Sequence, residues 1–250
     1  MLDKRKFYIN GRWVEPKKPN DFNVINPCNE DTCAIISLGS KEDTNAAIKS
    51  AKNAFETWKE TTKEDRLNYL EKLLSVYKKR SREMAEAISL EMGAPMDWAT
   101  EVQTASGQSH LEDFILRLKD FEFDEHFNEK SNNHICYEPI GVCGLITPWN
   151  WPINQIALKV IPALATGCTM ILKPSEIAPI SGMLFAEMID EVGFPKGVFN
   201  LVNGDGAGVG THLSGHPDVD MISFTGSTRA GRLISKNAAE TIKRVCLELG

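Results

Sequence analysis

The sequence predicts an α/β fold built around an open parallel sheet with helices on both faces. After residue 140, apolar runs of strand length alternate with stretches of helical periodicity. Residues 41–119 place apolar side chains at helical spacing, whereas residues 1–40 contain short extended runs separated by turns. The 250 residues, 42% hydrophobic and 25% charged, are enough for one large globular domain or two modest ones.

Composition and charge exclude several classes of partner. The formal net charge is 28 − 34 = −6, and no basic stripe is present, so we expect no nucleic-acid partner. No apolar run approaches the roughly 20 residues of a membrane span, and no secretory signal core follows the start. The six cysteines lie mostly in apolar runs without CxxC spacing, which predicts reduced, buried thiols in a cytoplasmic protein.

The first 40 residues predict hairpins without chemistry of their own. Residues 7–9 and 12–14 flank Asn10-Gly11, which is the strongest short signal of a β-hairpin. Further extended runs are expected at residues 24–25 and 33–38.

Residues 41–119 predict amphipathic helices that serve packing. Ser40 with Asp43, and Thr61 with Glu64, match the spacing of a capping box, which begins a helix. We therefore expect Ser40 and Thr61 to stand just before the first residues of two helices.

A boundary is predicted after this helical region. Gly93 is expected to end one helix, and Pro95 to help begin the next. Residues 120–140 are acidic and aromatic, and then extended from 134 to 139. Such a detached extended segment can pair with another strand, including a strand of a second subunit.

From residue 141 the pattern repeats strand and helix, as in a doubly wound sheet. The expected strands cover residues 142–146, 169–172, 198–202, 219–224 and 244–249. The expected helices follow at residues 153–164, 181–192 and after 231.

The first of these strands leads into a rigid loop with one amide side chain. Pro148 and Pro152 fix φ and remove backbone donors, so the loop between them is extended and stiff. Trp149 and Trp151 wall the loop, and Asn150 is a neutral hydrogen-bond donor. Ligands of open α/β sheets lie outside the carboxyl ends of strands, so Asn150 could hold a reacting carbonyl there.

Two glycine-rich segments follow strands. Gly226 to Gly231 (GSTRAG) opens a helix, where free N–H groups and the Ser227 hydroxyl favour a phosphate, although a plain strand-to-helix turn is an equal alternative. Residues 204–210 (GDGAGVG) fail the dinucleotide fingerprint, because its third glycine position holds Val209 or Thr211, so a flexible or closely packed turn is favoured.

Charged residues at two strand ends allow two readings each. Lys173 and Glu176 could bind the hydroxyls of a ribose, but taken by themselves these residues favour a solvated ion pair. Glu248 stands in an apolar run, where burial would raise its pKa toward the range of a general base. The alternative is an edge carboxylate satisfied by a backbone amide. His212 and His216 lack helical continuity and a HExxH glutamate, so we expect no metal site.

The order of these motifs resembles the N-terminal half of an aldehyde dehydrogenase. PWNWP, KPSE, FTGSTRAG and LELG each follow or end a strand of one alternating unit. The resemblance extends to Asn26-Pro27 and to EPIGVCG from Glu138, and so covers essentially the whole chain. It implies a Rossmann-like open parallel sheet with flanking helices, truncated before the catalytic domain.

The resemblance implies a mechanism with named residues. In this family a cysteine thiolate attacks the aldehyde, and the asparagine of PWN, here Asn150, holds the oxyanion. Hydride transfer then leaves a thioester, and the glutamate of LELGG, here Glu248, activates the water that hydrolyses it. Lys159 matches a family lysine assigned to proton relay, although a helix-surface lysine is an equal alternative.

The resemblance also implies NAD as cofactor, with NADP as the alternative. Glu176 would repel a 2′-phosphate, which favours NAD. The expected cofactor-binding residues are Ile146, Thr147, Pro148, Trp149, Lys173, Ser175, Glu176, Gly206, Gly210, Phe224, Thr225, Gly226, Ser227, Gly231 and Leu249. No metal is expected.

The implied organisation divides the chain into three parts. Residues 1–119 form an N-terminal arm and the helical part of the NAD-binding domain, residues 120–140 a linker and oligomerisation strand, and residues 141–250 the βα-repeat core. A small-molecule aldehyde is the expected substrate, and a homodimer or homotetramer the expected full-length assembly.

The chain departs from the family pattern in its nucleophile. The family's cysteine follows LELGG within a GQxC-type motif, and no cysteine here has that context. We therefore expect a fragment, or a truncated record, of a protein about twice as long, inactive as printed. The alternative is a stand-alone NAD-binding or assembly module. A third variant, acyl transfer to coenzyme A or phosphate, fits Glu248 less well, because a water-activating base suits hydrolysis.

Overall fold

A computed structural model describes residues 1–128 and 132–250, so residues 129–131 of the predicted linker lie outside the described part. At its centre is a seven-stranded sheet of order β12-β11-β8-β9-β10-β2-β3. The strands from β12 to β10 are parallel, which confirms the predicted α/β class. Their bounds are β8 Val142–Ile146, β9 Thr169–Lys173, β10 Phe199–Leu201, β11 Met221–Gly226 and β12 Arg244–Leu249.

The sheet is mixed rather than wholly parallel, because the N-terminal hairpin joins it. The predicted hairpin is confirmed as β2 (Phe7–Tyr8) and β3 (Trp13–Val14). Asn10 and Gly11 both have positive φ, 54° and 68°, as the tight turn requires. Tyr8 then pairs antiparallel with Leu201 of β10. The hairpin thereby covers a strand that would otherwise be an open edge.

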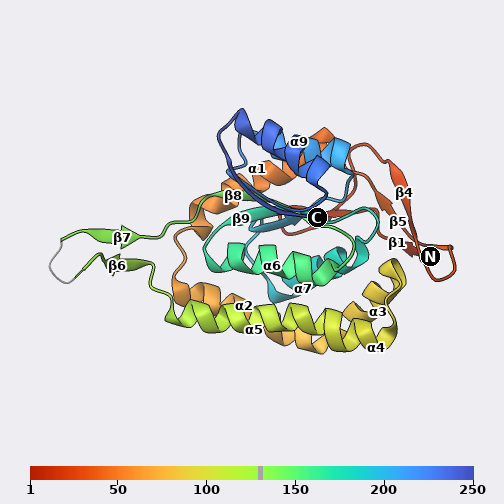
Figure 1. The fold of residues 1–250 in the computed structure, drawn as a ribbon, viewed down its shortest axis with the longest axis horizontal. Coiled ribbons are helices and arrows are strands. Elements are labelled where there is room, and N and C mark those ends of the chain that lie inside the picture. Colours follow the sequence, from red (N-terminus) through yellow and green to blue (C-terminus); the bar gives the residue numbers. More distant parts are fainter. Residues whose placement is uncertain (129–131) are drawn as a thin grey trace.

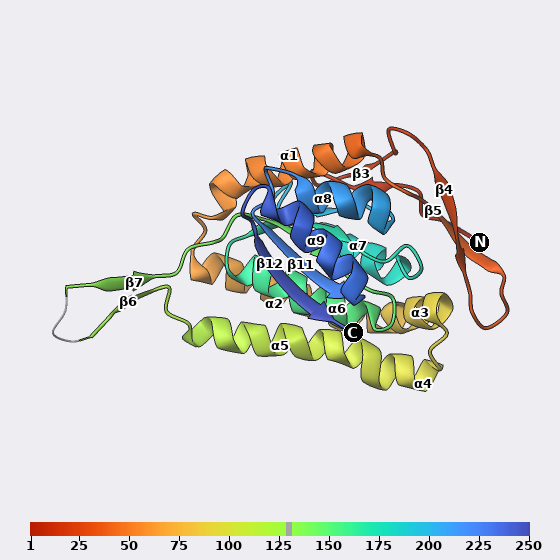
Figure 2. The same ribbon diagram turned by 45° about the horizontal axis from the view of Figure 1, so that its top comes forward.

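Helices cover both faces of this sheet (Figure 1). On one face lie α6 (Pro152–Ala165) and α7 (Ile180–Val192), backed by α2 (Lys63–Lys79), α3 (Ser81–Met92) and α5 (Ala105–Asp120). Two short segments, α4 (Met96–Trp98) and η1 (Ala99–Thr104), connect α3 to α5. The other face carries α1 (Lys41–Trp58), α8 (Thr211–Gly215) and α9 (Thr228–Ala239), as Figure 2 shows. Strand residues alternate between the two apolar cores that these layers enclose.

One predicted capping box is confirmed, and the other is displaced by one residue. Ser40 and Asp43 cap α1 reciprocally. At α2 the box is formed by Thr62 and Asp65, so the predicted pair Thr61 and Glu64 was wrong. Thr61 is engaged at the end of the preceding helix, where its hydroxyl donates to the carbonyl of Trp58. Gly93 ends α3 in the left-handed region, and α4 begins after Pro95, both as predicted.

Two smaller sheets lie outside the central one. Strands β1 (Leu2–Asp3), β4 (Asp21–Ile25) and β5 (Thr32–Ser37) form the first. The second is a hairpin of β6 (Asp124–His126) and β7 (His134–Cys136), which projects from the body as an arm (Figure 1). The predicted extended segment is therefore confirmed at β7, and its partner strand belongs to the same chain. Phe127 on this arm is 63% exposed.

Two strands differ in their bounds from the prediction. β10 is shorter than the expected 198–202, and β11 begins at Met221 rather than at residue 219. Before β11 the chain is still turning, because Val219 donates to the carbonyl of His216. The carboxylate of Asp220 then accepts from the backbone N–H of Val142 at 2.7 Å. None of the described helices is long and apolar enough to cross a membrane.

Candidate active site

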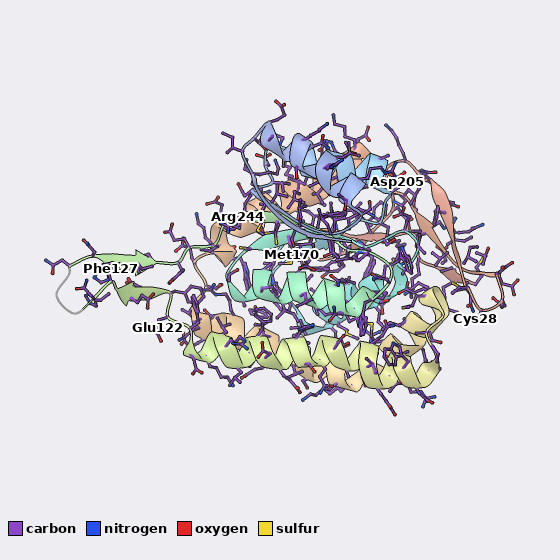
Figure 3. All side chains as sticks on the ribbon, in the orientation of Figure 1. Cys28, Glu122, Phe127, Met170, Asp205 and Arg244 are labelled. Carbon is purple, nitrogen blue, oxygen red and sulfur yellow. The ribbon has the colours of Figure 1, made fainter. Side chains whose placement is uncertain are left out.

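The carboxyl ends of β8, β9, β11 and β12 meet at one edge of the sheet, because these strands are parallel neighbours. Figure 3 shows the two ends of the sheet: Arg244, which begins β12, lies at one end, and Asp205, which follows β10, at the other. Met170 lies between them in the core. The predicted loop, the KPSE segment, the glycine–serine turn and Glu248 all belong to the Asp205 end.

Glu248 is held by side chains from two different elements. Thr225, its direct neighbour across β11 and β12, donates its hydroxyl to Oε2 at 3.1 Å. Lys159 of α6 approaches Oε1 to 3.7 Å. The Glu248 side chain is 51% exposed, so the predicted burial was wrong: an edge strand leaves one flank of each side chain open. The alternative of a backbone amide partner is replaced by these two side chains.

Lys159 is a buried residue and not a helix-surface lysine. Its side chain is only 2% exposed, although it belongs to an amphipathic helix on the sheet. Burial lowers the pKa of Lys159, and the Glu248 carboxylate opposes that shift. The reading of Lys159 as a helix-surface lysine was therefore wrong, and its role in proton relay stays a prediction.

Asn150 lies in the loop between β8 and α6 and is exposed. α6 begins at Pro152, with Trp151 as its N-cap residue. Asn150 therefore leads into the same helix whose Lys159 contacts Glu248. Seven residues separate Pro152 from Lys159, about 10 Å along the axis, and helical side chains lean back toward the N-terminus. Asn150 and Lys159 are thus linked through one helix, the first in the loop that leads into it and the second on its buried face.

Lys173 is also buried rather than part of a solvated pair. Its ammonium donates to the carbonyls of Pro174 (3.0 Å) and Gly204 (2.5 Å) and to the Glu176 carboxylate at 3.2 Å. Burial lowers the pKa of Lys173, and Glu176 opposes that shift. The Ser175 hydroxyl accepts a hydrogen bond from the backbone N–H of Ile177, which constrains the backbone of the KPSE segment.

The glycine–serine segment forms the N-terminus of α9. Ser227 is the N-cap residue, and its hydroxyl accepts from the backbone N–H of Ala230 at 3.3 Å. Gly226 has φ +159°, and a Cβ there would lie 2.5 Å from the Phe224 ring. A Cβ at Gly231 would lie 2.7 Å from Leu249, so the helix packs closely on β12. The exposed helix start can present backbone N–H groups to an anion.

The GDGAGVG segment is helical, so the predicted turn was wrong. Residues Gly206–Gly210 form η2, a π-helical turn that continues into α8. The helix begins here because Asp205 is its N-cap residue, and the Asp205 carboxylate accepts from the backbone N–H of Gly208 at 2.6 Å. Gly206 is exposed with open space around its Cα, whereas Gly210 is buried. A second helical N-terminus therefore reaches the same edge.

The loop after β8 offers a further test of whether a cofactor fits. Ile146 and Thr147 are buried, Pro148 is half-buried and Trp149 is 51% exposed. The Thr147 hydroxyl is buried without a hydrogen-bond partner among the described residues. Together with the Lys173–Glu176 pair and two helix N-termini, this edge supplies donors for a ribose and a phosphate. The residues present thus fit a dinucleotide.

Other candidate groups are not brought to this edge. His212 bonds to Asn45 at 2.6 Å, and no group of three metal-ligating side chains occurs among residues 1–128 and 132–250. All six cysteines are free, but Cys28, Cys136 and Cys246 are exposed, so the prediction that they are mostly buried was wrong for these. Cys28 lies in a turn, Cys136 ends β7, and Cys246 lies within the edge strand β12, so each is left at the surface.

Cavities formed by the described residues also lie away from this edge. The larger, about 1040 Å³, is lined by Lys4, Trp13 and Glu187, and the smaller, about 440 Å³, by Arg66 and Tyr137. Neither cavity is lined by the residues of the candidate edge.

Sequence reasoning missed the link between Thr225 and Glu248, because their pairing needs the order of the strands. Thr225 was expected only to contact a cofactor. Thr225 and Glu248 each stand one residue before the end of their strand. This shared position predicts their pairing only once β11 and β12 are known to be parallel neighbours.

The fold and its edge place the chain in the class of open α/β proteins whose ligand site lies at the carboxyl ends of parallel strands. Comparison with known proteins gives the family. The aldehyde dehydrogenase family model matches residues 13–250. The chain belongs to the aldehyde dehydrogenase family.

Individual relatives agree with this assignment. A 3-succinoylsemialdehyde-pyridine dehydrogenase of a Pseudomonas species is 53% identical over all of this chain and 52% of its own length. An aldehyde dehydrogenase of Bartonella henselae superposes with a TM-score of 0.99 at 61% identity, covering 100% of this chain and 53% of that one. A mutant aldehyde dehydrogenase C of Pseudomonas syringae, in complex with NAD+ and octanal, superposes with a TM-score of 0.96 at 45% identity. That match covers 98% of this chain and 50% of the other. The chain spans about half the length of the curated relatives it matches.

Proposed function

We propose that this chain is the cofactor-binding part of an enzyme that oxidises an aldehyde to a carboxylic acid with NAD. The observation that carries the proposal is the contact of Lys159 on α6 with Glu248 near the carboxyl edge of the sheet. The loop that carries Asn150 leads into the same helix. Family membership supports it, as do the NAD+ complexes of related structures. A cysteine nucleophile supplied outside these 250 residues is part of the proposal.

The proposed roles follow from the chemistry of each side chain. The Asn150 amide donates a hydrogen bond to the oxyanion that develops when the aldehyde carbon is attacked. Glu248 takes a proton from the water that hydrolyses the acyl group, which needs an ionised carboxylate with a free lone pair. Lys159, buried on α6, lies 3.7 Å from Oε1 and contacts the carboxylate from the helix side.

The edge described above would hold the dinucleotide. Lys173 and Glu176 would bind the adenosine ribose, Ser175 beside them, and Gly226 with Ser227 the pyrophosphate at the start of α9. The remaining contacts are proposed for Ile146, Thr147, Pro148, Trp149, Gly206, Gly210, Phe224, Thr225, Gly231 and Leu249. When bound, NAD supplies the hydride acceptor of the reaction. NADP is the second candidate cofactor, disfavoured by the Glu176 charge.

A homodimer or homotetramer is the proposed assembly, with the β6–β7 arm as its oligomerisation element. The arm projects from the body and exposes Phe127 (63%) and Tyr137 (46%), which a second copy could cover (Figure 1). Residues 1–119, 120–140 and 141–250 remain the proposed division of the chain. A cytoplasmic location is also proposed, since the cysteines are free thiols.

The experiment that tests the proposal uses the whole protein and follows NADH formation with short aliphatic, aromatic, betaine and semialdehyde substrates. Asn150→Ala should lower kcat by about 10²–10³ through loss of an oxyanion donor. Glu248→Gln should abolish steady turnover and leave one equivalent of NADH formed. Glu240→Gln, an exposed carboxylate after α9, is the matched control and should keep the wild-type rate.

Two results would contradict the proposal. Unchanged rates in both site variants would remove the roles of Asn150 and Glu248. A whole protein that binds NAD but reduces none with any aldehyde would favour the alternative, a binding or assembly module without chemistry.

A further inference from the structure

Thr225 and Glu248 form a cross-strand pair with a direct hydrogen bond. They are register partners in the parallel ladder of β11 and β12, and the Thr225 hydroxyl donates to Glu248 Oε2 at 3.1 Å. Side chains alternate along a strand, so Ser223 and Cys246, two residues earlier on each strand, share this face. Phe224, which points the other way, packs in the core beneath α8 and α9.

Each carboxylate oxygen of Glu248 thus has its own partner from a different element. Thr225 of β11 holds Oε2, and Lys159 of α6 lies 3.7 Å from Oε1. The glutamate side chain is still 51% exposed, so its other lone pairs stay open to water. An exposed glutamate without such contacts would sample several rotamers. A general base needs both properties, a fixed direction and an accessible lone pair.

We propose that Thr225 is a positioning residue, whose hydroxyl orients the Glu248 carboxylate for water activation. This inference rests on the proposed function of Glu248 as general base. It assigns the threonine hydroxyl to the hydrolytic step, which is distinct from the cofactor contact expected of the same residue.

Two substitutions separate the hydroxyl from the rest of the side chain. Thr225→Val keeps the branched shape and its packing but removes the donor. Thr225→Ser keeps the donor and removes the methyl group. Ser223→Ala is the matched control, because Ser223 is a hydroxyl residue on the same strand and the same face.

The experiment uses the whole protein with limiting aldehyde. The rapid burst of NADH reports the steps before hydrolysis, and the later release of acyl group reports water attack. Thr225→Val should keep the burst amplitude and slow acyl release about tenfold, the usual scale for one hydrogen bond to a charged group. Acyl release should be restored to within about twofold of wild type in Thr225→Ser, which keeps the hydroxyl, and Ser223→Ala should not change it.

A stronger nucleophile provides an internal check. Hydroxylamine added after the burst attacks the thioester without needing a general base, giving the hydroxamic acid and the free thiol. It should therefore release the acyl group equally fast from Thr225→Val and wild type. A structural defect would slow both nucleophiles.

Two results would overturn the positioning role. One is a normal rate of acyl release in Thr225→Val. The other is a weakened burst with a raised KM for NAD in Thr225→Val, which would make Thr225 a cofactor contact only. A wild-type protein that forms no NADH with any aldehyde would overturn the proposed function itself, and this inference with it.

Discussion

Lys159 Nζ lies 3.7 Å from Glu248 Oε1, although the lysine side chain is 2% exposed and the glutamate side chain 51%. The pair joins a helix on one face of the sheet to the edge strand β12. A buried ammonium without a nearby carboxylate would be costly, so the pair fixes the position of both groups. The proposed mechanism depends on this contact.

Lys159→Met in the whole protein should lower kcat about tenfold or more, which corresponds to about 1.4 kcal/mol. The substitution removes the ammonium group beside the proposed general base and keeps an apolar side chain of similar length. Burial lowers the pKa of Lys159, so the wild-type rate should fall at alkaline pH, where this lysine loses its proton earlier than an exposed one. The pH profile of kcat measures both effects. Lys236→Met, an exposed position on α9, is the control. A Lys159 variant with the wild-type profile would contradict the prediction.

Glu176→Gln should change cofactor choice. The carboxylate accepts from the buried Lys173 at 3.2 Å and is the group expected to bind ribose hydroxyls and repel a 2′-phosphate. We expect kcat/KM for NAD to fall about tenfold while the value for NADP falls less, so that their ratio narrows. Steady-state kinetics with both cofactors measure this ratio. Glu64→Gln, an exposed position in the first turn of α2, should leave it unchanged. A ratio that stays the same in Glu176→Gln would argue against this ribose site.

Ser181→Ala should destabilise the protein more at pH 8 than at pH 5. The Glu91 carboxylate is fully buried and accepts from the backbone N–H and hydroxyl of Ser181 and from the backbone of Ile180. Burial raises the pKa of Glu91 to about 7, against 4.5 when unfolded, and the Ser181 donors oppose that shift. Between these values the folded state holds the extra proton, so stability falls as pH rises toward 7.

Without the Ser181 hydroxyl the ionised carboxylate loses a donor, which should lower the unfolding free energy by about 1–3 kcal/mol at pH 8 and by less at pH 5. Denaturant titrations at both pH values measure the difference. Ser50→Ala is the matched control, since its buried hydroxyl has no partner among residues 1–128 and 132–250. Equal losses at both pH values would contradict the assigned role of Glu91.

Local signals predicted much of the fold, and non-local contacts limited the rest. Asn10-Gly11 predicted its hairpin because a two-residue turn depends only on its own φ values. That the hairpin would join β10 was not predictable, because this pairing spans 193 residues (201 − 8). Thr61 and Thr62 are both able to cap a helix, so the sequence alone did not distinguish them. Thr61 instead donates to the carbonyl of Trp58 at the end of α1, and Thr62 caps α2.

The candidate site shows the same limit. The motifs predicted which residues follow strand ends, and the structure places them at one edge. The partners of the buried lysines could not be predicted, because Lys159 contacts Glu248 of β12 and Lys173 donates to the Gly204 carbonyl, both distant in sequence. The Asp205 cap was hidden because glycines dominate the segment that it turns into a helix.

Gly144→Ala should destabilise the sheet that carries the candidate site. Gly144 is the buried middle residue of β8, and a Cβ there would lie 2.5 Å from Ile222 Cδ1 and 2.9 Å from Leu213 Cγ. Both neighbours are fully buried, so neither can move without disturbing the core between the sheet and α8. Overpacking of this kind costs about 1–3 kcal/mol. Gly215→Ala is the control, because its Cβ would meet only Asn237 at 3.9 Å. Thermal unfolding of the two variants should show a lowered Tm for Gly144→Ala alone, and equal Tm values would mean that β8 and α8 are not packed as described.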